Sequence, residues 1–200
     1  MGKSEVKHMA QKTKPIRPKS ISSRALQTKT GPHALKGKAT SAKATAQKDE
    51  IGTFLSFSTG STPPPNYYMA LLGLPPRPNI ELLDTVQAGL NYGAFDHFQR
   101  VLQLPATEVA RLLQIPSSTL VRRKERGRFD STESERLLRF SRLFAAAVEL
   151  FEGDADAARH WMQTPKPALN NTTPLEMART EIGAREVENL IDRLENGVYS

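Results

Sequence analysis

The stretch HWMQTPKPALNNTTPLEMARTEIGAREVENLIDRLENGVYS, residues 160–200, carries the densest local signals in the chain. Trp161 is the only tryptophan. Thr173-Pro174-Leu175-Glu176 has the form of a capping box, in which side chains satisfy the free amide donors at a helix start, with proline at the first helical position. The stretch therefore predicts a proline-rich connection that leads into a short helix.

A further helix is predicted over residues 184–196. Its apolar side chains recur at helical spacing and form one stripe: Val187, Leu190, Ile191 and Leu194. Gly197 suits the left-handed conformation that ends many helices, which leaves Val198-Tyr199-Ser200 as a tail. Residues 145–200 contain 10 acidic and 5 basic side chains, so this end of the chain suits a partner with a basic pocket.

Upstream, the pattern stays helical as far as about Tyr67, and no segment indicates a strand. Apolar spacing predicts helices ending at Gly89, over Phe95–Leu102 and around Val109–Leu113. A capping box at Thr132-x-x-Glu135 is expected to open a long helix that ends near Gly153 and is apolar on more than one face. We therefore predict an all-α chain, with the long helix in the core or in a dimer interface.

Residues 106–126, ATEVARLLQIPSSTLVRRKER, meet the requirements of a helix-turn-helix. Ala110 supplies the small residue needed where the two helices cross, beside Val109 and Leu113 on the buried side. Ile115 is expected to anchor the turn, and Leu120 to hold the second helix to the core. Gln114 stands where glycine is usual, so it must adopt a left-handed or altered turn that costs about 1 kcal/mol.

The exposed face of the second helix is expected to contact DNA. Ser and Thr can bond phosphates or bases near a helix N-terminus, and Arg can donate two hydrogen bonds to guanine. The predicted DNA-contacting residues are Ser117, Ser118, Thr119, Arg122, Arg123 and Arg126. Arg123 falls where such motifs often place an apolar side chain. The alternative is a scaffold retained for packing, with residues 122–128 as a solvated basic face.

Over residues 67–200 the chain resembles the Xre/MbcA/ParS antitoxins, whose toxins carry the RES domain. The positions that carry the resemblance are Leu72-Gly73-Leu74-Pro75, Ala88-Gly89-Leu90, Leu113-Gln114-Ile115-Pro116, Arg122-Arg123, Trp161, Pro165, Pro167, Leu169, Thr173 to Glu176, Gly183, Val187 and Gly197-Val198-Tyr199. The resemblance implies an Xre-like helix-turn-helix that dimerises and in many members binds operator DNA. It also implies a C-terminal toxin-binding domain.

The resemblance further implies how the toxin is neutralised. RES toxins degrade NAD or transfer ADP-ribose from it, and the family antitoxins push their C-terminal residues into the toxin's cleft. The implied toxin-binding residues are Trp161, Glu195, Asn196, Gly197, Val198, Tyr199 and Ser200. Among these, residues 197–200 form the plug, and Glu195 and Asn196 can meet arginines that line the pocket. Taken singly, Trp161 and the C-terminal helix are better explained by core packing, and only their combination with the family spacing favours toxin binding.

The positive charge of the chain is concentrated at its start. Residues 1–50 contain 12 basic and 3 acidic side chains, and residues 51–200 contain 16 and 18. Because the arm has few apolar side chains, it is predicted to be disordered, and it either adds non-specific phosphate contacts or is a solvated extension. The predicted regions are an arm and Pro-rich linker (1–66), a helix-turn-helix and dimerisation domain (67–153) and a toxin-binding domain (154–200).

Several function classes are disfavoured. The sequence has no run of 18 apolar residues, no secretory signal and no cysteine, so a cytoplasmic protein without membrane spans or disulfides is expected. The four histidines lack ligand spacing and no phosphate-binding glycine loop is present, so no metal, cofactor or catalytic residue is expected.

The sequence therefore predicts a non-enzymatic antitoxin. We expect it to block a RES toxin and to bind operator DNA, as a homodimer or as a hetero-oligomer with the toxin. The alternative is a stand-alone helix-turn-helix regulator whose C-terminal domain senses another ligand or protein.

Overall fold

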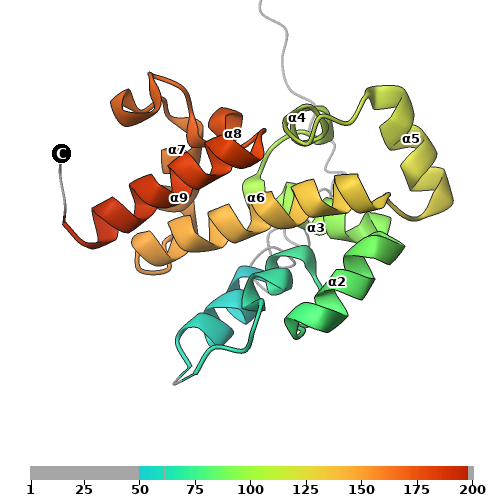
Figure 1. Ribbon diagram of the computed structural model, residues 1–200, viewed down its shortest axis with the longest axis horizontal. Helices are drawn as coiled ribbons and strands as arrows, with labels where there is room; N and C mark the ends of the chain where they lie inside the picture. Colours follow the sequence, from blue (N-terminus) through green and yellow to red (C-terminus); the bar gives the residue numbers. More distant parts are fainter. Residues whose placement is uncertain (1–49, 61, 198–200) are drawn as a thin grey trace, which may run out of the picture. The chain divides into compact units, whose positions relative to one another are not determined.

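The computed structural model describes residues 50–60 and 62–197, which belong to one compact unit. In these residues the secondary structure is helical, with two isolated β-bridges and no strand, so the all-α prediction is confirmed (Figure 1). Residues 50–58 are helical and precede the other elements. These are η1 (Tyr67–Leu72), α2 (Asn79–Ala88), α3 (Tyr92–Leu102), α4 (Ala106–Leu112), α5 (Ser117–Arg126), α6 (Ser131–Leu150), α7 (Ala155–Gln163), η2 (Pro167–Leu169), α8 (Pro174–Met177) and α9 (Glu181–Glu195). No helix in this part of the chain is long and apolar enough to cross a membrane.

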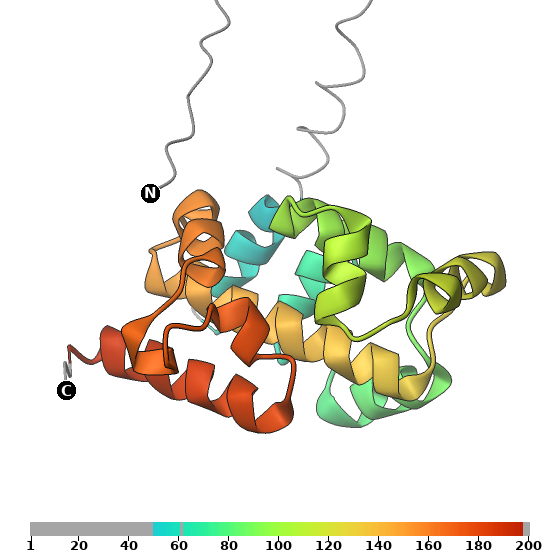
Figure 2. The same cartoon turned by 90° about the horizontal axis from the view of Figure 1, so that it is seen from above.

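Helix α6 forms the centre of the unit. It packs against η1, α2, α7 and α9, which surround it in the two views (Figure 1 and Figure 2). Its buried apolar side chains point to more than one side of the helix and are Leu137, Leu138, Phe140, Leu143, Phe144, Ala145, Ala147 and Val148. The long helix is therefore a core element, which confirms the first of the two places that the sequence predicted for it.

The start of α6 differs from the predicted one. The capping residue is Asp130, whose carboxylate accepts a hydrogen bond from the Glu133 amide at 2.8 Å. The Glu133 carboxylate accepts from the Asp130 amide at 3.0 Å, which completes the capping box. The predicted box at Thr132-x-x-Glu135 is therefore wrong by two residues, because Asp-x-x-Glu has the same spacing and Glu133 has a second partner described below.

The folded unit also begins earlier than Tyr67. Phe54 is fully buried, and its ring stacks on Tyr67 with the centroids 5.5 Å apart. Residues 50–58 are thus part of the core and not of a linker, which corrects the predicted boundary at residue 66. The prediction for residues 1–49 lies outside the described residues. The predicted division after Gly153 falls between α6 and α7, which pack together, and stays a prediction about function.

Candidate functional site

The predicted helix-turn-helix is formed by α4, a turn over residues 113–116, and α5. In the turn, Gln114 has a φ of 56°, the left-handed conformation that the sequence required of it. The Ile115 amide donates to the Ala110 carbonyl at 2.8 Å, which closes the end of α4. The Arg136 guanidinium of α6 donates to the Leu113 carbonyl at 3.1 Å. The non-glycine turn is therefore held by hydrogen bonds from both sides.

The packing residues predicted for this motif occupy the expected places. Those buried are Val109, Ala110, Leu113 and Ile115, and Leu120 is half-buried against the core. Helix α5 contributes little else to the core, because Arg123, at 8% exposed, is its only other buried residue. The rest of α5 is available to a partner.

Arg123 is not on the exposed face, contrary to the prediction. Its residue is 8% exposed, and its guanidinium bonds Glu133 at 2.6 Å and Asp130 at 2.7 Å. These two carboxylates belong to the capping box of α6, and the hydrogen bond with Glu133 raises the pKa of Arg123. An arginine at this usually apolar position is tolerated because both carboxylates neutralise it. Arg123 therefore links α5 to the start of α6 through ion pairs and is not placed to contact DNA.

The other predicted DNA-contacting residues lie at the surface. Ser117, Ser118, Arg122 and Arg126 are exposed, and Thr119 is half-buried. Val121, between these residues in the sequence of α5, is also exposed, by 59%. The sequence analysis did not single out Val121. The core contact in this part of α5 is made by Leu120, as predicted.

At the other end of the chain, the apolar stripe of α9 packs on α6. Val187, Leu190 and Ile191 are buried there. The helix begins at Glu181, three residues earlier than predicted, because the Thr180 hydroxyl accepts from the Gly183 amide at 3.1 Å. The apolar face of α9 is thus used for folding, and a partner can meet only its polar face or its end.

Gly183 is required by the packing of α8 against α9. A Cβ atom at this position would lie 1.9 Å from the Met177 carbonyl oxygen, which is backbone and cannot move aside. The glycine and valine of the family-like spacing, Gly183 and Val187, therefore serve the fold.

The predicted capping box of α8 is only half formed. The Thr173 hydroxyl accepts from the Glu176 amide at 3.2 Å and Pro174 occupies the first turn, as predicted. The Glu176 carboxylate pairs instead with Arg111 of α4 and with Arg179. The Gln114 side chain adds a hydrogen bond to the Arg179 carbonyl at 3.1 Å. Helix α8 is thereby joined directly to the helix-turn-helix.

Trp161 is largely buried, with 9% of its surface exposed. Its ring packs at an angle on Phe151, and the Lys166 ammonium lies 5.2 Å from the ring centroid. The side chain therefore acts first as a packing residue that supports the loop carrying Lys166. Its predicted contact with a toxin stays a prediction.

The C-terminal end of α9 is the other exposed candidate surface. Glu195, Asn196 and Gly197 are exposed, and Gly197 has the predicted left-handed conformation with a φ of 67°. Partial burial, followed by the charges of Asp192 and Glu149, raises the pKa of Glu195. A cationic partner would relieve this repulsion. Val198, Tyr199 and Ser200 lie outside the described residues. The ends of α9 and α5 lie on opposite sides of the unit (Figure 1 and Figure 2).

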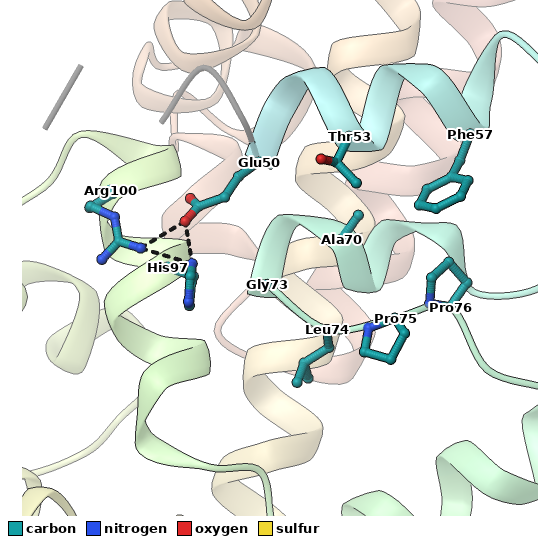
Figure 3. A pocket seen from close by; sticks show the side chains of 10 residues that line it. All are labelled: Glu50, Thr53, Phe57, Ala70, Gly73, Leu74, Pro75, Pro76, His97 and Arg100. Carbon is teal, nitrogen blue, oxygen red and sulfur yellow. Dashed lines mark hydrogen bonds and ion pairs between the residues drawn. The ribbon is translucent and has the colours of Figure 1, made fainter. Parts of the chain in front are cut away.

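A cavity of about 490 Å³ lies away from both surfaces, between residues 50–58, η1 and α3. On one side of it Arg100 bonds Glu50 at 2.7 Å, and His97 pairs with the same carboxylate (Figure 3). Apolar side chains line the opposite side, including Phe57 and Pro76. This cluster joins the first helix to α3. The described residues contain no group of three or more His, Asp or Glu side chains that could hold a metal ion.

Comparison with known proteins agrees with this arrangement. A family model of the antitoxin Xre-like helix-turn-helix domain matches residues 81–142, and one of the antitoxin Xre/MbcA/ParS C-terminal toxin-binding domain matches residues 146–197. The first match ends and the second begins within α6, so this helix belongs to both regions.

Individual relatives match as well. The chain is 42% identical over 130 residues to an Antitoxin Xre of Yersinia enterocolitica, covering 64% of this chain and 88% of the relative. It is 35% identical over 130 residues to an Antitoxin Xre of Photorhabdus laumondii, with the same coverage. An Antitoxin Xre of Pseudomonas putida is 35% identical over 92 residues, which are 46% of this chain and 57% of the relative. The chain thus belongs to the Xre antitoxins, with a helix-turn-helix domain and a C-terminal toxin-binding domain.

Proposed function

We propose that this chain neutralises a RES-domain toxin by inserting its C-terminal residues into the cleft where the toxin binds NAD. The observation that supports the proposal is the contrast between the buried stripe of α9 and its exposed C-terminal end. Its apolar stripe is buried on α6, whereas Glu195, Asn196 and Gly197 are exposed at the point where the last three residues begin. The proposed plug consists of Gly197, Val198, Tyr199 and Ser200.

Charge supports this mode of inhibition. A cleft that binds a dinucleotide needs basic groups for the two phosphates, and an arginine fork accepts a carboxylate as readily as a phosphate. Glu195 already lies close enough to Asp192 and Glu149 for their charges to raise its pKa. Docking against arginines would replace this repulsion with charge-assisted hydrogen bonds.

We also propose that α5 binds operator DNA and that the chain represses its own operon. The exposed serines and arginines of α5, namely Ser117, Ser118, Arg122 and Arg126, support DNA binding, with Thr119 partly accessible beside them. The motif is expected to act as a dimer, since two such helices read two half-sites. Ile80 and Leu83 of α2, exposed by 78% and 56%, are candidates for the dimer contact.

Co-expression with the neighbouring gene tests the toxin part of this proposal. We expect the two products to co-purify without NAD-consuming activity, and NAD loss to begin once the antitoxin is removed by denaturation and the toxin is refolded. A chain that lacks residues 198–200 should still fold, with an unchanged melting temperature, but should inhibit NAD loss poorly.

Two outcomes would contradict the toxin proposal. The first is a partner that consumes NAD at the same rate with and without the antitoxin. The second is full inhibition by the truncated chain, which would show that residues 198–200 do not act as the plug. If no partner co-purifies, the stand-alone regulator becomes the better description.

A further inference from the structure

Val121 is an exposed apolar side chain on a helix that is otherwise polar at its surface. It is 59% exposed, while the core contact of this part of α5 is made by Leu120, its neighbour in sequence. Folding therefore does not require an apolar side chain at position 121. A β-branched residue also has a slightly lower helix propensity than alanine or arginine, so local helix stability does not favour it either.

Val121 lies on the exposed side of α5, on the same side as the two serines that begin the helix. Residues three and four apart lie on the same face of a helix, so Ser118, Val121 and Glu125 form one row and Ser117 with Val121 another. Arg122 lies next to this row and is exposed. Val121 therefore shares one side of the helix with the hydroxyl groups of Ser117 and Ser118 and with the carboxylate of Glu125, and Arg122 follows it around the helix.

The chemistry of the major groove offers one apolar group to such a side chain. Of the four bases, only thymine presents a methyl group there, whereas the other bases present donors and acceptors that serine and arginine can bond. We propose that Val121 packs against the 5-methyl group of a thymine and selects a T·A pair at one position of each operator half-site. This inference rests on the proposed binding of DNA by α5.

Substitution of thymine by deoxyuridine tests the contact, because it removes the methyl group and leaves the base-pairing edge unchanged. The DNA is the promoter fragment upstream of the chain's own coding sequence, narrowed by footprinting, with each thymine replaced in turn. Affinities are measured by fluorescence anisotropy at one fixed salt concentration, since phosphate contacts make binding depend on salt.

For the full-length wild-type chain, we expect deoxyuridine at one thymine per half-site to weaken binding about fourfold, the effect of exposing one buried methyl group. The Val121→Ala variant should bind the unmodified operator several-fold more weakly, and should no longer distinguish thymine from deoxyuridine at that position. Ile182→Ala, which removes another exposed apolar side chain far along the chain, is the matched control and should behave as wild type.

Each contrary result has a separate meaning. If the wild type binds the operator but no deoxyuridine changes its affinity, or if Val121→Ala keeps the discrimination, the methyl contact is wrong and DNA binding by α5 stands. If Val121→Ala changes the state of association instead, the side chain belongs to a protein interface and the inference fails. If the wild type binds no promoter DNA above the level of random sequence, the DNA-binding function and this inference fail together.

Discussion

Helices α5 and α9 are both strongly amphipathic, yet they contribute to the fold in opposite ways. Helix α9 buries Val187, Leu190 and Ile191 against α6. Helix α5 buries only Arg123, through an ion pair with the cap of α6. Helix α9 is thus held by buried apolar area, whereas α5 is held by an ion pair and one half-buried leucine, Leu120. Most of the surface of α5 is therefore left for a partner, while α9 offers its polar face and its end.

Removal of the ion pair between Arg123 and Glu133 should have the largest effect on the free energy of unfolding. The Arg123→Ala variant leaves the buried Glu133 carboxylate without its positively charged partner, and breaking a buried ion pair in this way costs about 3 kcal/mol or more. Arg122→Ala, at the exposed neighbouring position, should change the free energy of unfolding by less than about 0.5 kcal/mol. Urea unfolding followed by circular dichroism measures the free energy of unfolding of both variants. Equal losses of stability in the two variants would show that the Arg123 ion pair does not hold α5 to α6.

The apolar side of the comparison is tested by two isoleucines of α9. Ile191 is 1% exposed and Ile182 is 78% exposed. Ile191→Ala should therefore lower the free energy of unfolding by about 3 kcal/mol, through lost burial and the cavity left behind. Ile182→Ala should be nearly neutral in the same urea titration. A substantial loss from Ile182→Ala would mean that α9 has a second apolar contact, for example in a dimer.

The recognition role of α5 predicts a smaller effect on binding. Arg122→Ala should weaken operator binding about tenfold, because an arginine contact to a base edge contributes about 1–3 kcal/mol. The melting temperature should stay unchanged, in contrast to Arg123→Ala. Anisotropy at fixed salt gives the affinity, and the same loss on random DNA would assign Arg122 to a phosphate rather than to a base.

The smallest expected effect concerns the ion pair between Arg111 of α4 and Glu176 of α8, which joins the helix-turn-helix to the C-terminal domain. It is a change in how the stability of the fold depends on pH. The hydrogen bond from Arg111, which outweighs partial burial, holds the pKa of Glu176 below its ordinary value. A carboxyl group with a lowered pKa in the folded state stabilises the fold above its unfolded pKa, and this stability is lost as the pH falls through the folded pKa. Below about pH 5, the wild type should therefore lose stability more steeply than Glu176→Gln. Because the pair is exposed, the difference should be modest.

A pH series of urea titrations measures this difference. Glu186→Gln, at an exposed position of α9, is the control and should follow the wild type. Parallel curves for the wild type and Glu176→Gln would show that the bond between α4 and α8 adds no stability in solution.

Much of this arrangement follows from the sequence because local patterns determine it. The helices from α2 to α9, the left-handed Gln114 and the ending of α9 at Gly197 all depend on spacing and on backbone preferences. The start of α6 differs from the predicted one because two possible capping boxes with equal spacing overlap there, Asp130-x-x-Glu133 and Thr132-x-x-Glu135. Only the tertiary partner, Arg123, favours Asp130 over Thr132 as the cap.

The candidate surfaces were less predictable. The sequence predicted Leu120 as the core contact of α5, which the structure confirms, but it gave no role to the neighbouring Val121, which is exposed. Arg123 and Glu176 were interpreted from their own segments, yet the structure pairs them with residues of other helices. Charges on a helix surface could not be assigned to a partner or to the fold before those neighbours were known.

The central claim is that the two ends of one compact unit serve two different partners. It is tested most directly by two variants in two assays: Arg122→Ala with Arg126→Ala, and the chain without residues 198–200, each measured for operator binding and for toxin inhibition. We predict that the double variant loses operator binding and still inhibits the toxin, while the truncated chain binds the operator and fails to inhibit. Loss of both activities in either variant would contradict the separation of the two surfaces.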